Sequence, residues 1–326
     1  MSIDLSLENI WRSWLAFRKG KHPSQELHEF QYDLEHNLFS LHQDLKEGTF
    51  RHRGYRSFIV CDNKRREVSV ASVRDRVVHR LLYDYLNEIY DNTFLYDAWS
   101  CRKGKGLLAA IQRAQGFLKK YPSSFVWRVD VKKFFDSVDQ KPLLKILSLR
   151  IKDIKALNLL REIIGSYTTL DRISGGGRGM PIGNLTSQIF ANIYLNELDR
   201  FVKHELKAKA YLRYGDDFII IDADRERLVQ SRERVRVFLE DRLTLQLHGK
   251  NDLILRTDDG LKFLGMVLYP PGRRLNSRNR KRVLERLNIR NAGSYLGMVN
   301  QFEKKKYLKR FRWRFVHLLG AVISAW

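Results

Sequence analysis

The sequence contains little cysteine and no long hydrophobic run. Its two cysteines, Cys61 and Cys101, are too few for a zinc site or a disulfide framework, and its nine histidines show no paired ligand spacing. No apolar stretch approaches the roughly 18 to 20 residues that span a bilayer, and the first residues lack the basic and then apolar pattern of a signal peptide. We therefore expect a protein of the reducing cytoplasm that does not enter a membrane, with Mg²⁺ as the only metal worth proposing.

Acidic residues are scarce relative to basic ones. The 326 residues include 60 Lys and Arg against 37 Asp and Glu, which gives a formal net charge of +23 and an isoelectric point near 10. Such a charge indicates an anionic partner, with nucleic acid favoured over an anionic membrane surface. Hydrophobic residues make up 44% of the chain, so we expect a globular protein, and its length suffices for two or three packed subdomains.

Hydrophobic periodicity predicts mainly helices in the first part of the chain. A single helix is expected over residues 27–45, where Leu and Phe recur at three- and four-residue steps, and Gly48 is expected to end it. After it we expect short strands over 55–73 around a basic turn, a helix over 75–90, and a basic glycine turn at 100–106 that opens a further helix.

The second part of the chain is predicted to alternate strands and helices. The expected elements, in chain order, are a strand over 125–131, two helices over 142–165, a glycine-rich loop over 174–184, a long helix capped by Asn184, a strand–turn–strand around Asp216, a charged helix over 225–242, a strand pair over 244–256 and a hydrophobic strand over 261–269. Pro270-Pro271-Gly272 is the clearest boundary in the sequence. Beyond it, residues 271–326 carry 15 Lys and Arg against 2 Glu.

Three aspartates lie where apolar runs end or turn back. Asp130 follows FVWRV, and Asp216 and Asp217 separate YLRY from FIII. Ionised carboxylates beside strands cost several kcal/mol unless they are paired or metal-bound, and together they would offer oxygen ligands to two hard divalent cations. Two such ions activate a 3′-hydroxyl and neutralise a pyrophosphate leaving group. The pattern favours nucleotide polymerisation on a nucleic acid, although each acid alone is equally typical of a solvated hairpin tip or a strand-end cap.

These acids belong to a longer series of motifs. In chain order the motifs are DRVVHRLL (75–82), SCRKGKG (100–106), VDVKKFFDSVD (129–139), GMPIGNLTSQIFANIYLNELD (179–199), YGDDF (214–218) and FLG (263–265). With them the chain resembles a reverse transcriptase of the prokaryotic retroelement type, and its GNLTSQ sequence is similar to those of diversity-generating retroelement and defence-associated bacterial enzymes. The resemblance implies an α+β right-hand polymerase fold whose palm is a small antiparallel sheet.

The resemblance also implies a metal site with two Mg²⁺ ions. Asp130 and Asp216 are expected to ligate both ions directly, and Asp217 is expected to give weaker or outer-sphere support. Val131 is expected to belong to the same metal-binding group. Lys250, in the turn after LQLHG, resembles the family's lysine that protonates the departing pyrophosphate as a general acid.

Four residues are expected to contact the incoming nucleotide. Phe135, the fifth residue after the first catalytic aspartate, would collide with a 2′-hydroxyl and so select deoxynucleotides, while Asp136 is expected to point elsewhere along the strand. Lys64 and Arg66 match the family's position for contacts with the triphosphate. Ile182 stands where many reverse transcriptases, including group II intron enzymes, carry Gln, and this replacement favours low fidelity.

The expected nucleic-acid contacts are distributed over all three parts of such an enzyme. These parts are an N-terminal extension with fingers over 1–127, a palm over 128–270 with a fingers insertion at about 140–180, and a short basic helical thumb over 271–326. The expected contacts are Arg76, Arg102 and Lys105 near the fingers, Gln188 and Asn192 on the long helix, and Arg278 and Arg282 in the thumb. In the thumb we expect Trp313 and Phe315 to be buried rather than stacked on bases.

The resulting hypothesis is RNA-directed DNA synthesis on a dedicated noncoding or template RNA, with a primer–template duplex and dNTPs as substrates. The biological setting is either a diversity-generating retroelement or an antiphage system. An accessory protein or a second polymerase subunit is expected in both settings, and self-association is a further option. The alternatives are a catalytically silent RNA-binding scaffold and an RNA-dependent RNA polymerase, which Phe135 disfavours.

Overall fold

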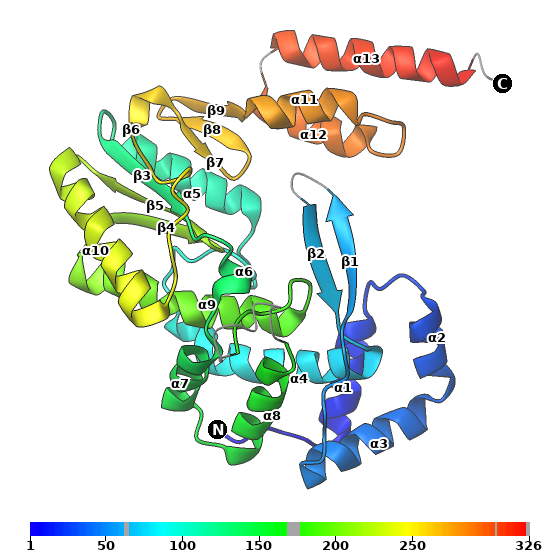
Figure 1. Ribbon diagram of the computed structural model, residues 1–326. Helices are drawn as coiled ribbons and strands as arrows, with labels where there is room; N and C mark the ends of the chain where they lie inside the picture. The colour runs from blue at the N-terminus through cyan, green and yellow to red at the C-terminus, as the bar shows by residue number, and fades with distance from the viewer. Residues whose placement is uncertain (62–64, 168–176, 304, 324–326) are drawn as a thin grey trace.

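Helices form the base of the molecule, and a four-stranded sheet lies beside them (Figure 1). The computed structural model describes residues 1–326 except 62–64, 168–176, 304 and 324–326. The helices that precede the sheet in the chain are α1 (Leu7–Arg18), α2 (Gln25–Tyr32), α3 (Leu34–Glu47), α4 (Val73–Tyr90) and α5 (Leu107–Lys120). No helix among the described residues is long and apolar enough to cross a membrane.

A two-stranded hairpin connects α3 to α4. Its strands β1 (Arg56–Cys61) and β2 (Arg65–Val70) are antiparallel, and every residue of β1 is exposed. In Figure 1 the two strands of the hairpin stand apart from the central sheet, and β1 runs toward the C-terminal helices. The Ser69 backbone N–H donates to the carbonyl of Ile182 at 3.0 Å, so the loop before α9 is fastened to β2.

The central sheet has the order β4–β5–β3–β6 and is antiparallel throughout. Residues on one face, such as Trp127 and Phe218, pack into the core around α9 and α10, whereas Val126 and Ile219 on the other face pack with α5 and the C-terminal elements. This alternation follows from the two-residue period of a strand. The strands are β3 (Phe125–Asp130), β4 (Ala210–Tyr214), β5 (Asp217–Asp222) and β6 (Leu253–Arg256).

Helix α9 is the central helix of the fold. It is buried along most of its length, including polar residues such as Asn192 and Asp199, and it contacts α4, α7 and α10. The helices of this region are α6 (Phe134–Ser137), α7 (Gln140–Arg150), α8 (Ile154–Gly165), α9 (Leu185–Arg200), which continues as a π-helix (Phe201–Glu205), and α10 (Arg225–Leu243).

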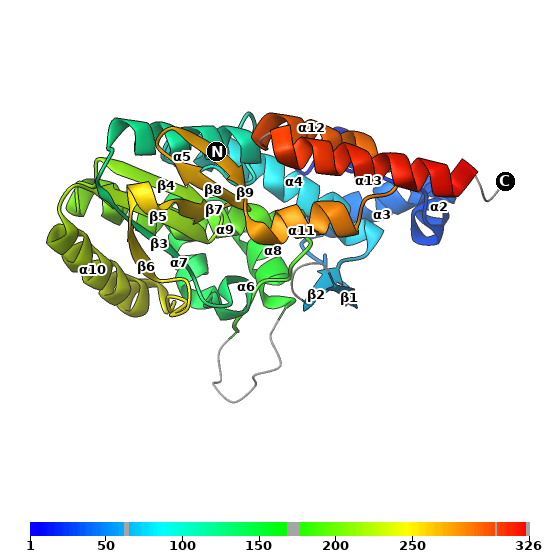
Figure 2. The ribbon, with the colours of Figure 1, turned by 90° about the horizontal axis from the view of Figure 1, so that it is seen from above.

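The C-terminal part combines a small sheet with three helices. It contains β7 (Leu261–Phe263), β8 (Met266–Tyr269), β9 (Gly272–Leu275), α11 (Ser277–Glu285), α12 (Ala292–Phe302) and α13 (Lys305–Ile323). Seen from above, α12 and α13 lie along one another (Figure 2). Phe311 is buried, whereas Trp313 is 66% exposed, so the expected burial of Trp313 is wrong. Phe315 is partly buried, as expected.

The helix expected over 27–45 is two helices. Asp33 breaks it with φ −118° and ψ 49°, and the Asn37 side chain donates to the carbonyl of Phe30 at 3.1 Å, in place of a continuing helical hydrogen bond. Gly48 ends the second helix in the left-handed conformation, as predicted. Asn184 occupies the N-cap position of α9, but its side chain binds Ser69 and Ala71 instead of capping the helix.

Two expectations for the region after α10 require correction. The strand pair expected over 244–256 reduces to β6, because residues 244–251 run past the end of β3 and make only one isolated bridge, Val131 with Leu247. The strand expected over 261–269 is two strands, because Leu264 and Gly265 have positive φ values and form a tight turn. Pro270 and Pro271 lie in the turn between the paired strands β8 and β9, and Gly272 begins β9; the domain boundary there stays a prediction.

Candidate active site

The three aspartates lie at one end of the central sheet. Asp130 is the last residue of β3 and stands directly opposite Asp217, the first residue of β5. Residues opposite one another on antiparallel strands share a face and have Cβ atoms about 4.5 to 5.5 Å apart. Asp216 lies in the turn before β5, and its carbonyl accepts a hydrogen bond from the Val131 backbone N–H at 3.2 Å. The structure therefore brings together the three acids that the sequence separates.

The turn that carries Asp216 is positioned by a buried ion pair. Gly215 has φ +65°, a conformation that favours glycine. The Arg213 guanidinium donates to the Gly215 carbonyl at 3.0 Å and to both carboxylate oxygens of Asp199 at 2.7 and 2.6 Å. Both charged side chains are fully buried, and the Tyr211 hydroxyl donates to Asp199 at 2.5 Å. This network links the turn that carries Asp216 to the central helix α9.

Two further residues contact the carboxylates and were missed by sequence reasoning. Asn251 donates to Asp130 Oδ1 at 2.7 Å from the turn that follows His248. Arg128 faces Asp217, with N–O distances of 3.3 and 3.4 Å. Arg128 precedes Asp130 by two residues on β3, so the two-residue period of a strand places both side chains on one face and could have predicted the contact. The contact of Asn251 with Asp130 instead depends on a loop 121 residues away in the sequence.

The electrostatic environment of Asp217 opposes its ionisation. The pKa of Asp217 is raised to about 6, chiefly by burial; Arg128 lowers it, and the neighbouring Asp130 and Asp216 raise it. A carboxyl whose charge is disfavoured by nearby carboxylates gains from a cation placed among them.

Asp217 should therefore give the metal-free protein a characteristic pH dependence of stability. Because its pKa is raised on folding, its contribution is fully present below about pH 4 and is lost as the pH rises through about 6. The loss corresponds to about 3 kcal/mol. We expect urea unfolding in EDTA to show this loss in the wild type but not in Asp217→Asn. Parallel pH profiles for the two proteins would contradict the assignment.

The oxygen chemistry of the three acids suits a divalent cation, since such ions prefer carboxylate ligands. Among the residues that the structure describes, no group of three or more His, Cys, Asp and Glu side chains stands close enough to hold a metal ion as placed. Asp130 and Asp217 instead point to Asn251 and Arg128. The three carboxylates thus suit such an ion by their chemistry and by the positions of their backbones. In this structure the side chains of Asp130 and Asp217 contact other side chains of the protein.

The residues expected to contact the incoming nucleotide lie on different elements of the structure. Phe135 is half-buried in α6, and its carbonyl accepts from the Met180 N–H at 2.7 Å, so it lies beside the loop that carries Ile182. Residues 134–137 are helical, so Asp136 does not lie on a strand, and the expectation that it points away along a strand is wrong. Arg66 is exposed on β2, and Lys64 lies outside the described residues.

Lys250 is exposed in the turn formed by residues 248–251. The His248 backbone N–H donates to the Asp130 carbonyl at 2.9 Å, which fastens this turn to the end of β3. Lys250 therefore lies on the same turn as Asn251, whose side chain contacts Asp130.

Several expected nucleic-acid contacts already have partners within the protein. Arg102 donates to Asp91 and to the carbonyls of Leu95 and Ala98, and Lys105 donates to the Tyr96 carbonyl at 2.6 Å. The same basic turn packs beside the β4–β5 hairpin, because the Trp99 backbone N–H donates to the Arg213 carbonyl in β4 at 2.9 Å. Arg76 pairs with Glu26 at 3.3 Å.

The expected contacts on α9 and α11 differ in exposure. Gln188 is exposed, whereas Asn192 is buried, donates to the Ser100 carbonyl at 2.8 Å and accepts from Arg213. In α11, Arg278 is exposed and Arg282 is half-buried. A direct contact with nucleic acid stays a prediction for each of these residues.

Comparison with known proteins shows which family the sequence matches. Residues 45–268 match the family described as reverse transcriptase (RNA-dependent DNA polymerase). The chain is 25% identical to Protein YkfC of Escherichia coli over 240 residues, which cover 63% of each chain. It is 23% identical to the group II intron-encoded protein LtrA of Lactococcus lactis over 299 residues, which cover 71% of this chain and 49% of LtrA. The chain thus spans less than two thirds of the length of these relatives.

The fold also has solved counterparts. Telomerase from Candida albicans superposes with a TM-score of 0.51 at 13% identity, covering 84% of this chain and 56% of the telomerase chain. Telomerase from Candida tropicalis gives the same TM-score at 11% identity, covering 84% and 58%. These similarities show the fold alone, which is that of a right-hand polymerase. Since the family match covers more than half of the sequence and includes all three aspartates, the chain belongs to the reverse transcriptase family.

Proposed function

We propose that this chain is an RNA-directed DNA polymerase that joins deoxynucleotides with two Mg²⁺ ions. The observation that supports this most is that Asp130, Asp216 and Asp217 lie together at one end of the central sheet. Reverse transcriptase domains generally use divalent metal ions, which polarise the attacking hydroxyl and neutralise the leaving group. Asp130 and Asp216, with Val131 beside them, would hold these ions, and Asp217 would support them from β5.

The protein's own groups would complete the reaction. Lys250 is exposed on the turn fastened to Asp130, and in our proposal it gives a proton to the departing pyrophosphate. Arg66, which is exposed on strand β2 of the hairpin, would bind the triphosphate. In the same assignment the hairpin belongs to the fingers, the central sheet is the palm, and the helices after residue 271 form the thumb.

Phe135 would exclude ribonucleotides from this site. Its ring is half-buried, lies 5.4 Å from that of Phe134, and is held beside the loop that carries Ile182 by the Met180 hydrogen bond. We expect Phe135→Ala to raise rNTP relative to dNTP incorporation by at least about tenfold, equivalent to about 1.4 kcal/mol. Steady-state incorporation of matched dNTP and rNTP pairs measures this ratio.

The neighbouring Phe134→Ala is the control for Phe135, since Phe134 is buried in the hydrophobic core. That variant should lose stability without a change in sugar preference. An unchanged ratio in folded Phe135→Ala would remove Phe135 from sugar selection. A wild type that incorporates rNTPs as readily as dNTPs would favour the RNA-dependent RNA polymerase.

Ile182 would lower the fidelity of copying. An aliphatic side chain donates no hydrogen bond to the incoming base and sugar, so one check on pairing geometry is missing. We expect Ile182→Gln to reduce the misincorporation frequency several-fold, measured by sequencing products from a defined template. An ordinary error rate in the wild type that does not change in Ile182→Gln would count against this role.

The template in our proposal is a dedicated noncoding or repeat RNA, copied in the bacterial cytoplasm from a primer–template duplex. The charge of +23 supports an RNA partner, and the setting is a diversity-generating retroelement or an antiphage system, with an accessory protein or second subunit. Paired template and variable repeats near the gene would favour the first setting, and a noncoding RNA in a defence locus the second. Sequencing the RNA and any attached DNA that copurify with the protein identifies the template.

A silent RNA-binding scaffold is the remaining alternative. Burial, together with the neighbouring Asp130 and Asp216, raises the pKa of Asp217, and a group of acids placed in this way has no use in such a scaffold and therefore argues for an enzyme. Salt-dependent RNA binding without metal-dependent synthesis would favour the scaffold instead.

A further inference from the structure

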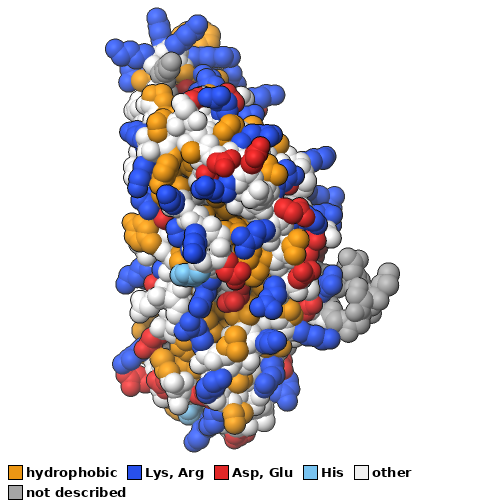
Figure 3. Space-filling model, turned by 90° about the vertical axis from the view of Figure 1, so that its left-hand side faces the viewer, with side chains coloured by type: hydrophobic (Ala, Val, Ile, Leu, Met, Phe, Trp, Pro, Cys, Tyr) orange, Lys and Arg blue, Asp and Glu red, His pale blue; other side chains and the backbone are white. Residues whose placement is uncertain are grey.

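A cavity of about 1160 Å³ lies between α7, α9 and α10. In Figure 1, α7 and α9 lie below the central sheet, and α10 lies on the left-hand side of the molecule. None of the three catalytic aspartates lines the cavity. Figure 3 shows this side of the molecule, where Lys and Arg side chains spread over its whole height and Asp and Glu lie among them. The cavity is therefore separate from the candidate active site.

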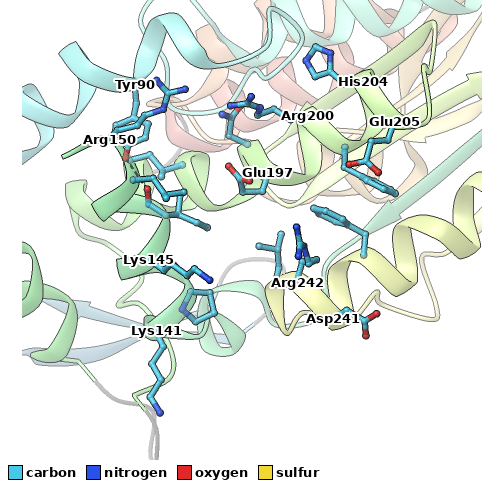
Figure 4. A pocket seen from close by; sticks show the side chains of 18 residues that line it. Tyr90, Lys141, Lys145, Arg150, Glu197, Arg200, His204, Glu205, Asp241 and Arg242 are labelled. Carbon is cyan, nitrogen blue, oxygen red and sulfur yellow. Dashed lines mark hydrogen bonds between the residues drawn. The ribbon is translucent and has the colours of Figure 1, made fainter. Parts of the chain in front are cut away.

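The cavity collects positive charge from three helices. Five Lys and Arg residues line it against three Asp and Glu residues. Figure 4 shows Lys145 of α7 and Arg242 of α10 pointing toward its middle, near Glu197, whereas Lys141 and Asp241 point away. Among the described residues, neither Lys145 nor Arg242 forms an ion pair with a carboxylate. Cations held near one another without such pairs favour an anion between them.

Aromatic rings form the apolar part of the wall. Phe201 and Phe238 line the cavity and stack with a centroid distance of 4.3 Å and an interplanar angle of 13°. Tyr90 also lines it, and its hydroxyl donates to the carbonyls of Ile146 and Leu147 at 3.4 Å, which fixes the ring against α7. Tyr90 and Phe201 are 2% and 8% exposed, whereas Phe238 is partly exposed, so Phe238 is the ring that can offer a stacking face to a base, independent of the base sequence.

A buried polar group in the wall lacks a partner. Asn196 is 5% exposed, and its Oδ1 finds no hydrogen-bond donor in the part of the chain that the structure describes. The same helix then widens into the π-helix 201–205, marked by the hydrogen bond from the Leu206 N–H to the Phe201 carbonyl. Such widenings recur at functional sites, and this one places His204 and Glu205 in the cavity wall.

We propose that this cavity binds a single-stranded segment of RNA. Phosphates would contact Lys145, Arg200 and Arg242, a base would stack on Phe238, and a base or ribose donor would satisfy Asn196. The volume exceeds the range of about 300 to 1000 Å³ that is usual for one small molecule, which favours a strand over a free nucleotide. Since the cavity is separate from the catalytic aspartates, the bound segment is one that is not being copied. The proposal adds an RNA contact to the proposed function and does not require catalysis.

The test uses the full-length protein without Mg²⁺, with the catalytic cleft first saturated by a primer–template duplex. A short unstructured RNA that carries 4-thiouridine and fluorescein is then added. We expect crosslinks to peptides of α7, α9 and α10. We also expect Lys145→Ala/Arg242→Ala to lower the affinity and to reduce the slope of log K against log salt by about one to two.

The matched control is Lys152→Ala/Arg225→Ala, which removes two exposed cations that do not line the cavity. It should bind the RNA with the wild-type salt slope. Crosslinks confined to other parts of the chain, or equal losses in the two double variants, would overturn the proposal. Competition by AMP as effective as that by the RNA would assign the cavity to a free nucleotide and also overturn it.

Discussion

Replacing Asp216 or Asp217 with alanine is expected to abolish dNTP incorporation while leaving the protein folded. Asp216 lies in the turn joined to Val131, and Asp217 stands opposite Asp130, so each variant removes one carboxylate from the shared edge. Metal ions at such a site contribute several kcal/mol to the transition state, so the rate should fall by about 10³-fold or more. Primer extension measures the rate, and circular dichroism checks the fold.

Asp258 and Asp259 provide the matched control for this prediction. They form a second Asp-Asp pair, both are exposed, and they lie in a short 3-10 turn (Thr257–Asp259) before β7. Alanine at either position should leave incorporation within about twofold of the wild type, since surface substitutions change little. Retained incorporation by both Asp216→Ala and Asp217→Ala would remove the proposed mechanism.

Replacing Arg213 with methionine is expected to cause the largest loss of stability. Arg213 and Asp199 are fully buried and joined by two hydrogen bonds, and the change would leave the Asp199 carboxylate buried with only the Tyr211 hydroxyl. Breaking one partner of a buried ion pair costs about 3 to 5 kcal/mol. Urea unfolding measures the loss, and because Arg213 also holds the Gly215 carbonyl, activity should fall in the remaining folded protein.

Arg236→Met is the control for the buried pair. Arg236 pairs with Glu233 and Glu240 on the surface of α10, where solvent screens ion pairs and leaves them little effect on stability. The two variants remove the same charge, so the difference between them reports burial. A loss below about 1 kcal/mol in Arg213→Met would show that the pair does not stabilise this fold.

The sequence contained most of the active site because the informative patterns are local. Apolar runs that end at Asp130 and turn at Gly215 predict strands, and strand geometry then places the acids at one edge. The same reasoning would have found Arg128, two residues before Asp130. Phe135 shows a limit of this approach, because the chain leaves the strand and enters a short helix before reaching it.

The remaining features depend on contacts between distant segments. The helix break at Asp33 is stabilised by the hydrogen bond from the Asn37 side chain to the Phe30 carbonyl, which hydrophobic periodicity does not predict. The Asn184 side chain donates to the carbonyl of Ser69, 115 residues earlier in the β1–β2 hairpin. Asn192, expected at the nucleic acid, is instead used to hold Ser100 and Arg213. Polar residues on a buried helix have several available partners, and only the tertiary fold selects among them.

Primer extension on an RNA template tests the account most directly. The purified protein, together with the RNA that copurifies with it, is given a DNA primer, Mg²⁺ and dNTPs, and is compared with Asp130→Asn. The account predicts DNA products from the wild type and none from the variant, although both proteins bind the RNA equally. Equal product from the two proteins, or RNA binding by the wild type without any synthesis, would contradict it.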